Sequence, residues 1–322
     1  MDLLPDLPDL PDRRAELPLD MPFTTARAAE LGVRPRVLGQ LVRAGLVRRV
    51  VEGVYVDAVV PDTTEVRARA VGLVIPRTAV VCDESAAWLH GVDVEPPQSH
   101  VVAPPVSVFQ EPGRTRVRKS GCVGGERTLL PSDVMEVDGV RVLTPLRLAC
   151  DLGRLRPRDQ ALGAMDALAR AGGLDAADVV RETERFSGMR GVVQLRDLGP
   201  RVDARAESLP ESWTRLRCQD GELPELTPQL EVRRAGAWGE SAFLDLGNEE
   251  LRFAVEYDGA DWHTTDEQRA RDGRRRGWLT REGGWGIVVL TRTHVPTLDR
   301  QLTIDVVRRG LDRHLAGRPV DP

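Results

Sequence analysis

The chain has 322 residues, of which 41% are hydrophobic and 30% are charged, a composition typical of a globular protein with two or three domains. Its formal net charge of -5 excludes a uniformly basic nucleic-acid-binding protein, so contacts with nucleic acid would need local positive patches. No apolar run approaches the ~18 residues of a membrane-spanning helix and no signal peptide is evident, so we expect a cytoplasmic protein without membrane contacts.

Cysteine and lysine usage narrows the chemistry further. The four cysteines are far apart and include no C-x-x-C pair, which predicts free thiols rather than a zinc ribbon or a disulfide framework. Lys119 is the only lysine, so phosphate contacts would be made mostly by the planar guanidinium groups of arginine.

Residues 1–20 are acidic and rich in proline, with a repeated Pro-Asp-Leu pattern. Because proline at every third residue opposes helix formation, we expect a disordered or extended tail. Such a tail could mask a basic surface, although a simple tail is the plainer interpretation.

Residues 21–62 show the pattern of two short helices followed by a hairpin. Thr24 or Thr25 caps the first helix, Pro35 opens the second, and Gly45 ends it. Residues 46–56 then predict two strands joined at Glu52-Gly53. This order predicts a winged-helix DNA-binding domain, in which the second helix enters the major groove. The arginines expected to contact phosphates are Arg34, Arg36 and Arg43 in the second helix and Arg48 and Arg49 in the hairpin.

The same stretch resembles the N-terminal domain of AbiEi-type antitoxins from type IV toxin–antitoxin systems. The residues that carry the resemblance are Ala29-x-x-Gly32-Val33, Leu41-Val42-x-x-Gly45 and Gly53-Val54-Tyr55. This resemblance implies DNA as a partner, with a toxin or a second copy of the chain as a further partner. The alternative is a small winged-helix module that makes only protein contacts.

Residues 63–200 predict a mixed α/β middle region. Asp138-Gly139 is a strong hairpin turn, and Thr144-Pro145 starts a helix. The run from Thr144 to Leu152 also resembles the later part of AbiEi-like proteins. His90 and His100 lack neighbours at metal-ligand spacing, so we assign them structural roles and place a domain boundary near residue 200.

Residues 201–322 contain the candidate active site. The apolar strand at Phe253 runs into Glu256 and Asp258, whose side chains share one face of a strand. A turn at residues 247–250 would pair this strand with the one that carries Asp245. Three converging carboxylates repel one another unless a cation lies between them, which predicts a site for Mg²⁺ or Mn²⁺. The alternative is a solvated acidic face.

The pattern Asp245, strand, Glu256-x-Asp258-Gly259-x-x-Trp262-His263 resembles the very-short-patch-repair endonuclease type of the PD-(D/E)XK superfamily. The resemblance implies a restriction-endonuclease-like mixed sheet flanked by helices. It further implies that Glu211, Asp245 and Glu256 hold the metal, that Asp258 lies beside them, and that His263 orients or deprotonates water. Asp258 stands where the superfamily usually has lysine. Taken alone, Glu211 could simply pair with Arg215.

The helix expected over residues 266–282 is the densest positive patch in the chain. Its candidates for contact with a DNA backbone are Arg269, Arg274 and Arg275, and the alternative is a solvated helix.

We therefore predict an α/β multidomain protein: a winged helix, an α/β middle region and a restriction-endonuclease-like domain. The predicted function is a metal-dependent DNA endonuclease related to bacterial defence or toxin–antitoxin systems. The alternatives are a non-catalytic, antitoxin-like transcriptional repressor with a degenerate nuclease domain, and a protein-interaction scaffold. Carboxylates that converge on one ion would favour the enzyme, whereas a basic side chain from helix 266–282 in their midst would favour the repressor.

Overall fold

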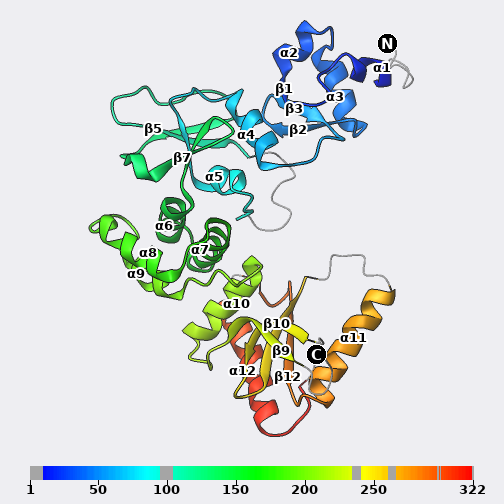
Figure 1. Cartoon of the computed structure of the whole chain (residues 1–322), viewed down its shortest axis with the longest axis vertical. Helices are drawn as coiled ribbons and strands as arrows, with labels where there is room; N and C mark the ends of the chain where they lie inside the picture. Colours follow the sequence, from blue (N-terminus) through cyan, green and yellow to red (C-terminus); the bar gives the residue numbers. More distant parts are fainter. Residues whose placement is uncertain are drawn as a thin grey trace. The chain divides into compact units, whose positions relative to one another are not determined.

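The structure is a computed structural model that describes residues 10–94, 104–233, 241–259, 266–295, 297 and 299–320, with only the backbone for residues 266–272 (Figure 1). Its internal contacts divide the chain into two compact units, Met1–Leu148 and Ala149–Pro322, which are described separately below. Both units combine helices with sheets, which confirms the α/β multidomain class.

The N-terminal unit begins with three helices and a small antiparallel sheet. The elements are α1 Leu10–Ala15, β1 Phe23–Thr24, α2 Thr25–Glu30, α3 Pro35–Arg43, β2 Val47–Val51 and β3 Val54–Asp57, with strand order β1-β3-β2. The hydroxyl of Thr24 caps α2 by accepting the N–H of Arg27 at 3.1 Å. Gly53 takes a φ of +75° in the hairpin turn, a conformation that glycine adopts without steric cost. The predicted helix starts and hairpin are therefore confirmed.

Helix α1 corrects the expectation of a disordered tail up to residue 20. Pro11 lies in the first turn of α1, where a missing N–H breaks no helical hydrogen bond. Arg14 Nε donates to Asp57 Oδ2 at 2.5 Å, and Leu17 is 5% exposed in a core shared with Phe23. Residues 10–17 are thus held by contacts with residues far along the chain.

The rest of the N-terminal unit is a five-stranded sheet with two helices, α4 Thr64–Gly72 and α5 Asp83–Leu89. Its strands are β4 Val80–Val81, β5 Val106–Gln110, β6 Cys122–Glu126, β7 Val134–Val137 and β8 Val140–Leu143, in the order β6-β5-β4-β8-β7. Asp138 and Gly139 have φ values of +45° and +76°, as the predicted turn requires. His90 Nε2 lies 2.7 Å from the carbonyl of Leu143, which agrees with a structural role, and His100 lies outside the described residues.

The C-terminal unit holds four helices that precede residue 200 and a sheet domain that follows it. The helices are α6 Pro145–Leu155, which spans the division, α7 Arg158–Gly172, α8 Ala176–Glu182 and α9 Val192–Leu198. The later elements are α10 Leu209–Asp220, β9 Thr227–Arg233, β10 Ser241–Asn248, β11 Phe253–Asp258, α11 Asp266–Arg281, β12 Gly286–Thr291 and α12 Arg300–Leu315.

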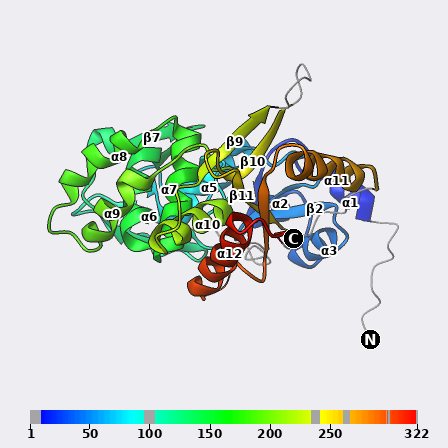
Figure 2. The same cartoon turned by 90° about the horizontal axis from the view of Figure 1, so that it is seen from below.

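The four strands of this domain form one mixed sheet in the order β12-β11-β10-β9, with β11 and β12 parallel. Alternate residues of β11 face opposite sides of the sheet. Val255 packs with Trp213 of α10 and Val307 of α12, whereas Ala254 packs with Leu279 of α11. Figure 2 shows β11 between α11 and α12. The face covered by α11 is the one that carries Glu256.

The division between the two compact units falls within α6, after Leu148, and the boundary that the sequence placed near residue 200 stays a prediction. Within the C-terminal unit, α7 packs along α10 through buried ion pairs. Arg215 Nη2 lies 2.7 Å from Asp166 Oδ2, and Arg217 Nη2 lies 2.8 Å from Asp159 Oδ2. Helix α7 is therefore part of the same core as the C-terminal sheet.

All four cysteines have free thiols, as expected, and Cys82, Cys150 and Cys218 are buried. Among the helices of the described ranges, none is long and apolar enough to cross a membrane.

Candidate functional site

The hairpin of β10 and β11 brings Asp245 next to Glu256. The strands pair antiparallel with Leu246 opposite Val255. Asp245 precedes Leu246 and Glu256 follows Val255, so the two acids are neighbours across the hairpin. Asp245 Oδ2 accepts the N–H of Tyr257 at 2.8 Å, which continues the hydrogen bonding between the strands where backbone pairing stops. The sequence predicted this proximity correctly.

Glu211 joins these two acids from the first turn of α10. Ser208 caps the helix, and its hydroxyl donates to Glu211 Oε1 at 2.8 Å. Glu211 Oε2 accepts the N–H of Glu207 at 2.9 Å and the side-chain amide of Gln229 at 3.2 Å. The suggested Glu211–Arg215 pair does not form, because Arg215 bonds to Asp166 instead.

Gln229 was not predicted as part of the site. It lies on β9 with a φ of +51°, a left-handed conformation that is uncommon outside glycine. Its side chain connects β9 to Glu211. A glutamine in an ordinary strand pattern gives no local signal for this conformation, so sequence reasoning had nothing from which to infer it.

Among the three acids Glu211, Asp245 and Glu256, Asp245 has a raised pKa. Burial, together with the negative charges of Glu211 and Glu256, raises the pKa of Asp245 to about 6, although the Tyr257 N–H and Arg275 act in the opposite direction. Asp245 is therefore close enough to Glu211 and Glu256 for their negative charges to act on it. The third carboxylate predicted from the sequence to converge with Asp245 and Glu256 was Asp258, which is exposed at the end of β11.

Two arginines of α11 supply the positive charge. Glu256 is 4% exposed; Arg275 Nη1 lies 2.9 Å from its Oε1 and Arg276 Nε lies 3.2 Å from its Oε2. Arg275 also donates to the backbone carbonyl of Phe243. The Arg275–Glu256 contact is an ion pair without hydrogen-bond alignment, since Glu256 Oε1 has no hydrogen-bond partner among the described side chains. Basic side chains of α11 thus occupy the position where a metal ion was expected.

The donor set in this arrangement does not fit a divalent cation. No group of three or more His, Cys, Asp or Glu side chains within the described residues is placed to hold a metal ion. Asp258 is exposed at the end of β11, and His263 lies outside the described residues. Both oxygens of Glu256 face guanidinium groups instead of a shared ion.

The arginines expected to bind DNA differ in exposure. Arg34 at the N-cap of α3, Arg36 and Arg43 of α3, and Arg49 of β2 are exposed. Arg48 is half-buried, and its guanidinium contacts the carbonyl of Val60 at 3.3 Å and Asp62 at 3.6 Å. On α11, Arg274 is exposed, Arg275 is directed at Glu256 rather than outward, and the side chain of Arg269 is outside the described part.

One segment of the chain matches a known protein family. Residues 79–200 match the family model described as the AbiEi antitoxin C-terminal domain. The match supports the antitoxin-like resemblance of the middle region and does not extend to residues 21–62.

Two curated relatives match most of the chain. It is 31% identical over 275 residues to the Uncharacterized protein Rv2248 of Mycobacterium tuberculosis (strain ATCC 25618 / H37Rv), covering 85% of this chain and 95% of the relative. The same values hold for the Uncharacterized protein MT2308 of Mycobacterium tuberculosis (strain CDC 1551 / Oshkosh). The chain therefore belongs to the family of these mycobacterial proteins.

A solved structure, titled Crystal structure of RV2827C protein from Mycobacterium tuberculosis, is similar at 14% identity with a TM-score of 0.32. The similarity covers 60% of this chain and 76% of that chain.

The raised pKa of Asp245 predicts a specific dependence of stability on pH. The folded protein keeps the Asp245 proton up to a pH of about 6, whereas the unfolded chain loses it near the ordinary value of 3.8. The folded state binds more protons between these values, so the contribution of Asp245 to the free energy of unfolding is lost as pH rises through this window.

We expect Asp245→Asn to be more stable than the wild type at pH 7.5 by about 1–2 kcal/mol, somewhat less than the full value of a two-unit shift because Asp245 is not fully buried. Urea unfolding at pH 5 and pH 7.5 measures this effect. Asp258→Asn, at the exposed end of the neighbouring strand β11, is the control and should change little. An Asp245→Asn variant that is less stable than the wild type at pH 7.5 would contradict the raised pKa of Asp245.

Proposed function

We propose that this protein is a DNA-binding regulator of the antitoxin class, in which residues 21–62 belong to a winged-helix domain. The observation that carries the proposal is the set of exposed arginines on α3 and β2, in a chain whose residues 79–200 match an antitoxin domain.

The order of elements supports the winged-helix interpretation. Three helices, one short strand between the first two, and a hairpin after the third follow one another, with β3 central in the sheet. Leu38 and Leu41 of α3 are buried in the domain core, which leaves the arginine-bearing side of α3 for the major groove. Arg49 of the hairpin is then available for the adjacent phosphates.

The features of the C-terminal domain favour a role in DNA binding over DNA cleavage. The proposal of a restriction-endonuclease-like domain is supported by the succession α10, β9, β10, β11, α11, β12, in which helices flank a mixed sheet. Its buried Glu256 is compensated by Arg275 and Arg276. We therefore interpret this domain as nuclease-derived and non-catalytic, and DNA and a toxin as the partners of the protein.

The test of DNA binding is a triple variant of α3, Arg34→Ala/Arg36→Ala/Arg43→Ala. We expect its affinity for a labelled duplex of about 20–30 base pairs to fall at least tenfold, with a smaller salt dependence between about 50 and about 200 mM, because each lost phosphate contact reduces the salt slope by about one. Fluorescence anisotropy measures both quantities.

Arg27→Ala is the matched control, because Arg27 is exposed on α2 and pairs with Glu30. Its affinity for DNA should stay close to that of the wild type. Salt-sensitive binding that the triple variant leaves unchanged would remove α3 as the DNA-reading element.

The second candidate function is a metal-dependent endonuclease, and the specific observation in its favour is the proximity of Glu211, Asp245 and Glu256. The resemblance would add His263 near the attacking water. Cleavage of supercoiled plasmid and mismatched duplex with Mg²⁺ or Mn²⁺ tests it. Metal-dependent nicking that both Asp245→Ala and Glu256→Ala abolish would replace the non-catalytic proposal.

A further inference from the structure

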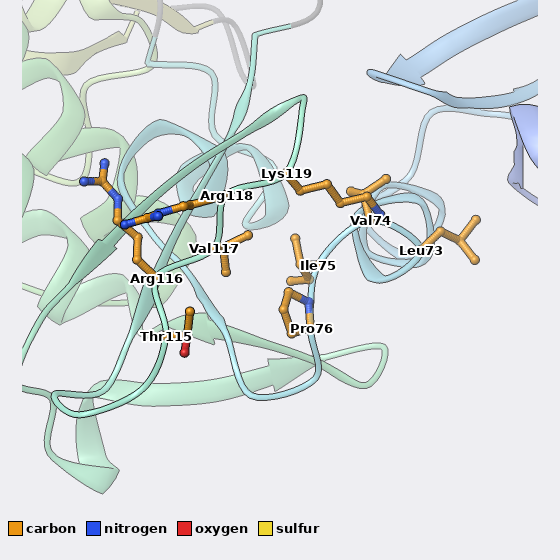
Figure 3. Close-up of a pocket in the computed structure, with 9 residues that line it drawn as sticks. All are labelled: Leu73, Val74, Ile75, Pro76, Thr115, Arg116, Val117, Arg118 and Lys119. Atoms are coloured by element: carbon orange, nitrogen blue, oxygen red, sulfur yellow. The ribbon is translucent and has the colours of Figure 1, made fainter.

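A groove in the N-terminal unit combines an apolar floor with a basic rim. It has a volume of about 490 Å³ and lies between the end of α4 and the segment of residues 115–119. Val74 and Val117 are buried in it and Ile75 is half-buried, whereas Leu73 is 45% exposed. Figure 3 shows Val117 and Ile75 between the two segments.

The rim carries positive charge that no carboxylate in the described part of the chain neutralises through an ion pair. Arg116, Arg118 and Lys119 are exposed, and none of them forms an ion pair with a carboxylate of the described residues. In Figure 3, Lys119 extends toward Val74, and Arg116 and Arg118 project from the other side of the segment. The basic rim suits an acidic ligand, and the apolar floor suits aliphatic side chains. An acidic peptide with aliphatic side chains would satisfy both, whereas a simple anion would leave the apolar floor exposed to water.

The chain contains such a peptide at its own N-terminus. Residues 1–9 read Met-Asp-Leu-Leu-Pro-Asp-Leu-Pro-Asp, with aspartate at positions 2, 6 and 9 and leucine at positions 3, 4 and 7. The segment contains no arginine or lysine. We propose that residues 1–9 dock in this groove of the same molecule, with their aspartates on the basic rim and their leucines on the apolar floor.

Two contacts show that the groove is within reach. Arg14 binds Asp57 at the end of β3, and Ser120 Oγ donates to Glu52 Oε1 at 2.5 Å beside the start of β3. Four residues of strand span about 13 Å, and Leu10 is about one helical turn from Arg14. Nine extended residues reach about 30 Å, which is more than twice the length of β3 between these two contacts.

The docked segment would bring its negative charges beside Glu52, at the tip of the β2–β3 hairpin. This inference goes beyond the proposed function, because the docking is a property of the isolated protein and does not require DNA. If the hairpin also binds DNA, the segment would compete with phosphate for the same region.

The single lysine permits a direct test on the full chain. A carbodiimide joins an amine to a carboxylate in contact with it, and Lys119 carries the only side-chain amine in this sequence. We expect an amide between Lys119 and Asp2, Asp6 or Asp9, seen by mass spectrometry as tryptic peptide 1–13 joined to peptide 119–127 in monomeric protein. A Lys119–Glu52 product is the internal positive control, because Glu52 contacts the neighbouring Ser120.

Two variants separate docking from chance proximity. Arg116→Glu/Arg118→Glu should reduce the yield of the joined peptides several-fold, whereas Arg77→Glu, an exposed arginine that does not line the groove, should not. The variant Asp2→Asn/Asp6→Asn/Asp9→Asn should raise the rate of Lys119 acetylation several-fold, because the lysine becomes uncovered.

Three results would overturn the proposal. Lys119 that couples only to Glu52 would show an empty groove, and a product found only in cross-linked dimers would assign the groove to a second copy. Protection of Lys119 from acetylation by duplex DNA, together with no effect of the three asparagines, would assign the rim to DNA. The cross-linking results are measured without DNA, so they test the docking even if the proposed DNA binding through α3 fails.

Discussion

Arg215→Ala is expected to lower the free energy of unfolding by about 3–5 kcal/mol, because it leaves the carboxylate of Asp166 buried without its cation. The two side chains are 4% and 1% exposed, and Arg215 also donates to the carbonyl of Arg201 at 2.7 Å. Urea unfolding at neutral pH measures the loss. The pair joins α7 to α10, so the loss should be accompanied by faster proteolysis near residue 200.

A matched comparison distinguishes ion pairing from helix packing. Arg205→Ala removes an exposed pair with Asp203 and should cost less than about 1 kcal/mol. Asp166→Asn/Arg215→Met leaves no buried charge and keeps an acceptor for the N–H of Asp203, so it should be more stable than Arg215→Ala. A double variant as unstable as the single one would show that packing, rather than charge, holds these helices together.

Arg275→Ala/Arg276→Ala is expected to cost about 2–4 kcal/mol, somewhat less than a fully buried pair because the two arginines are partly exposed. Without them, Glu256 is buried near Asp245 and Glu211 with no positive charge beside it. The loss of Arg275 should also raise the pKa of Asp245 further, since Arg275 now lowers it.

The same variant is expected to gain a response to divalent cations. Mg²⁺ or Mn²⁺ should raise the melting temperature of the double variant and leave that of the wild type unchanged, because the acids then lack another cation. Arg274→Ala, on an exposed position of the same helix, is the control. Adding Glu256→Gln to the double variant should abolish the response, and a response that survives this change would mean that the ion binds elsewhere.

Local signals in the sequence predicted much of the fold. Pro35 and Gly45 define the ends of α3, and Asp138-Gly139 defines the turn between β7 and β8, because these residues restrict or permit particular backbone angles. The same logic paired β10 with β11 and so placed Asp245 near Glu256.

The features of the structure that the sequence did not predict depend on contacts between residues far apart in the chain. Helix α1 depends on Asp57, 43 residues away from Arg14, and no local pattern encodes that pair. The arginines of α11 occur on more than one face of the helix in sequence, and only the packing of α11 on the sheet selects Arg275 and Arg276 for Glu256. Interpreting Arg275 as a DNA contact followed from its charge without knowledge of this packing.

The position of the division within α6 bears on which parts of the chain can be stable alone. The segment that matches the antitoxin model, residues 79–200, is divided between the two compact units. Its later half places Asp159 and Asp166 against arginines that lie beyond residue 200. A fragment that ends at residue 200 would leave these two carboxylates without their arginines. We therefore expect such a fragment to be less stable than one that continues through α10.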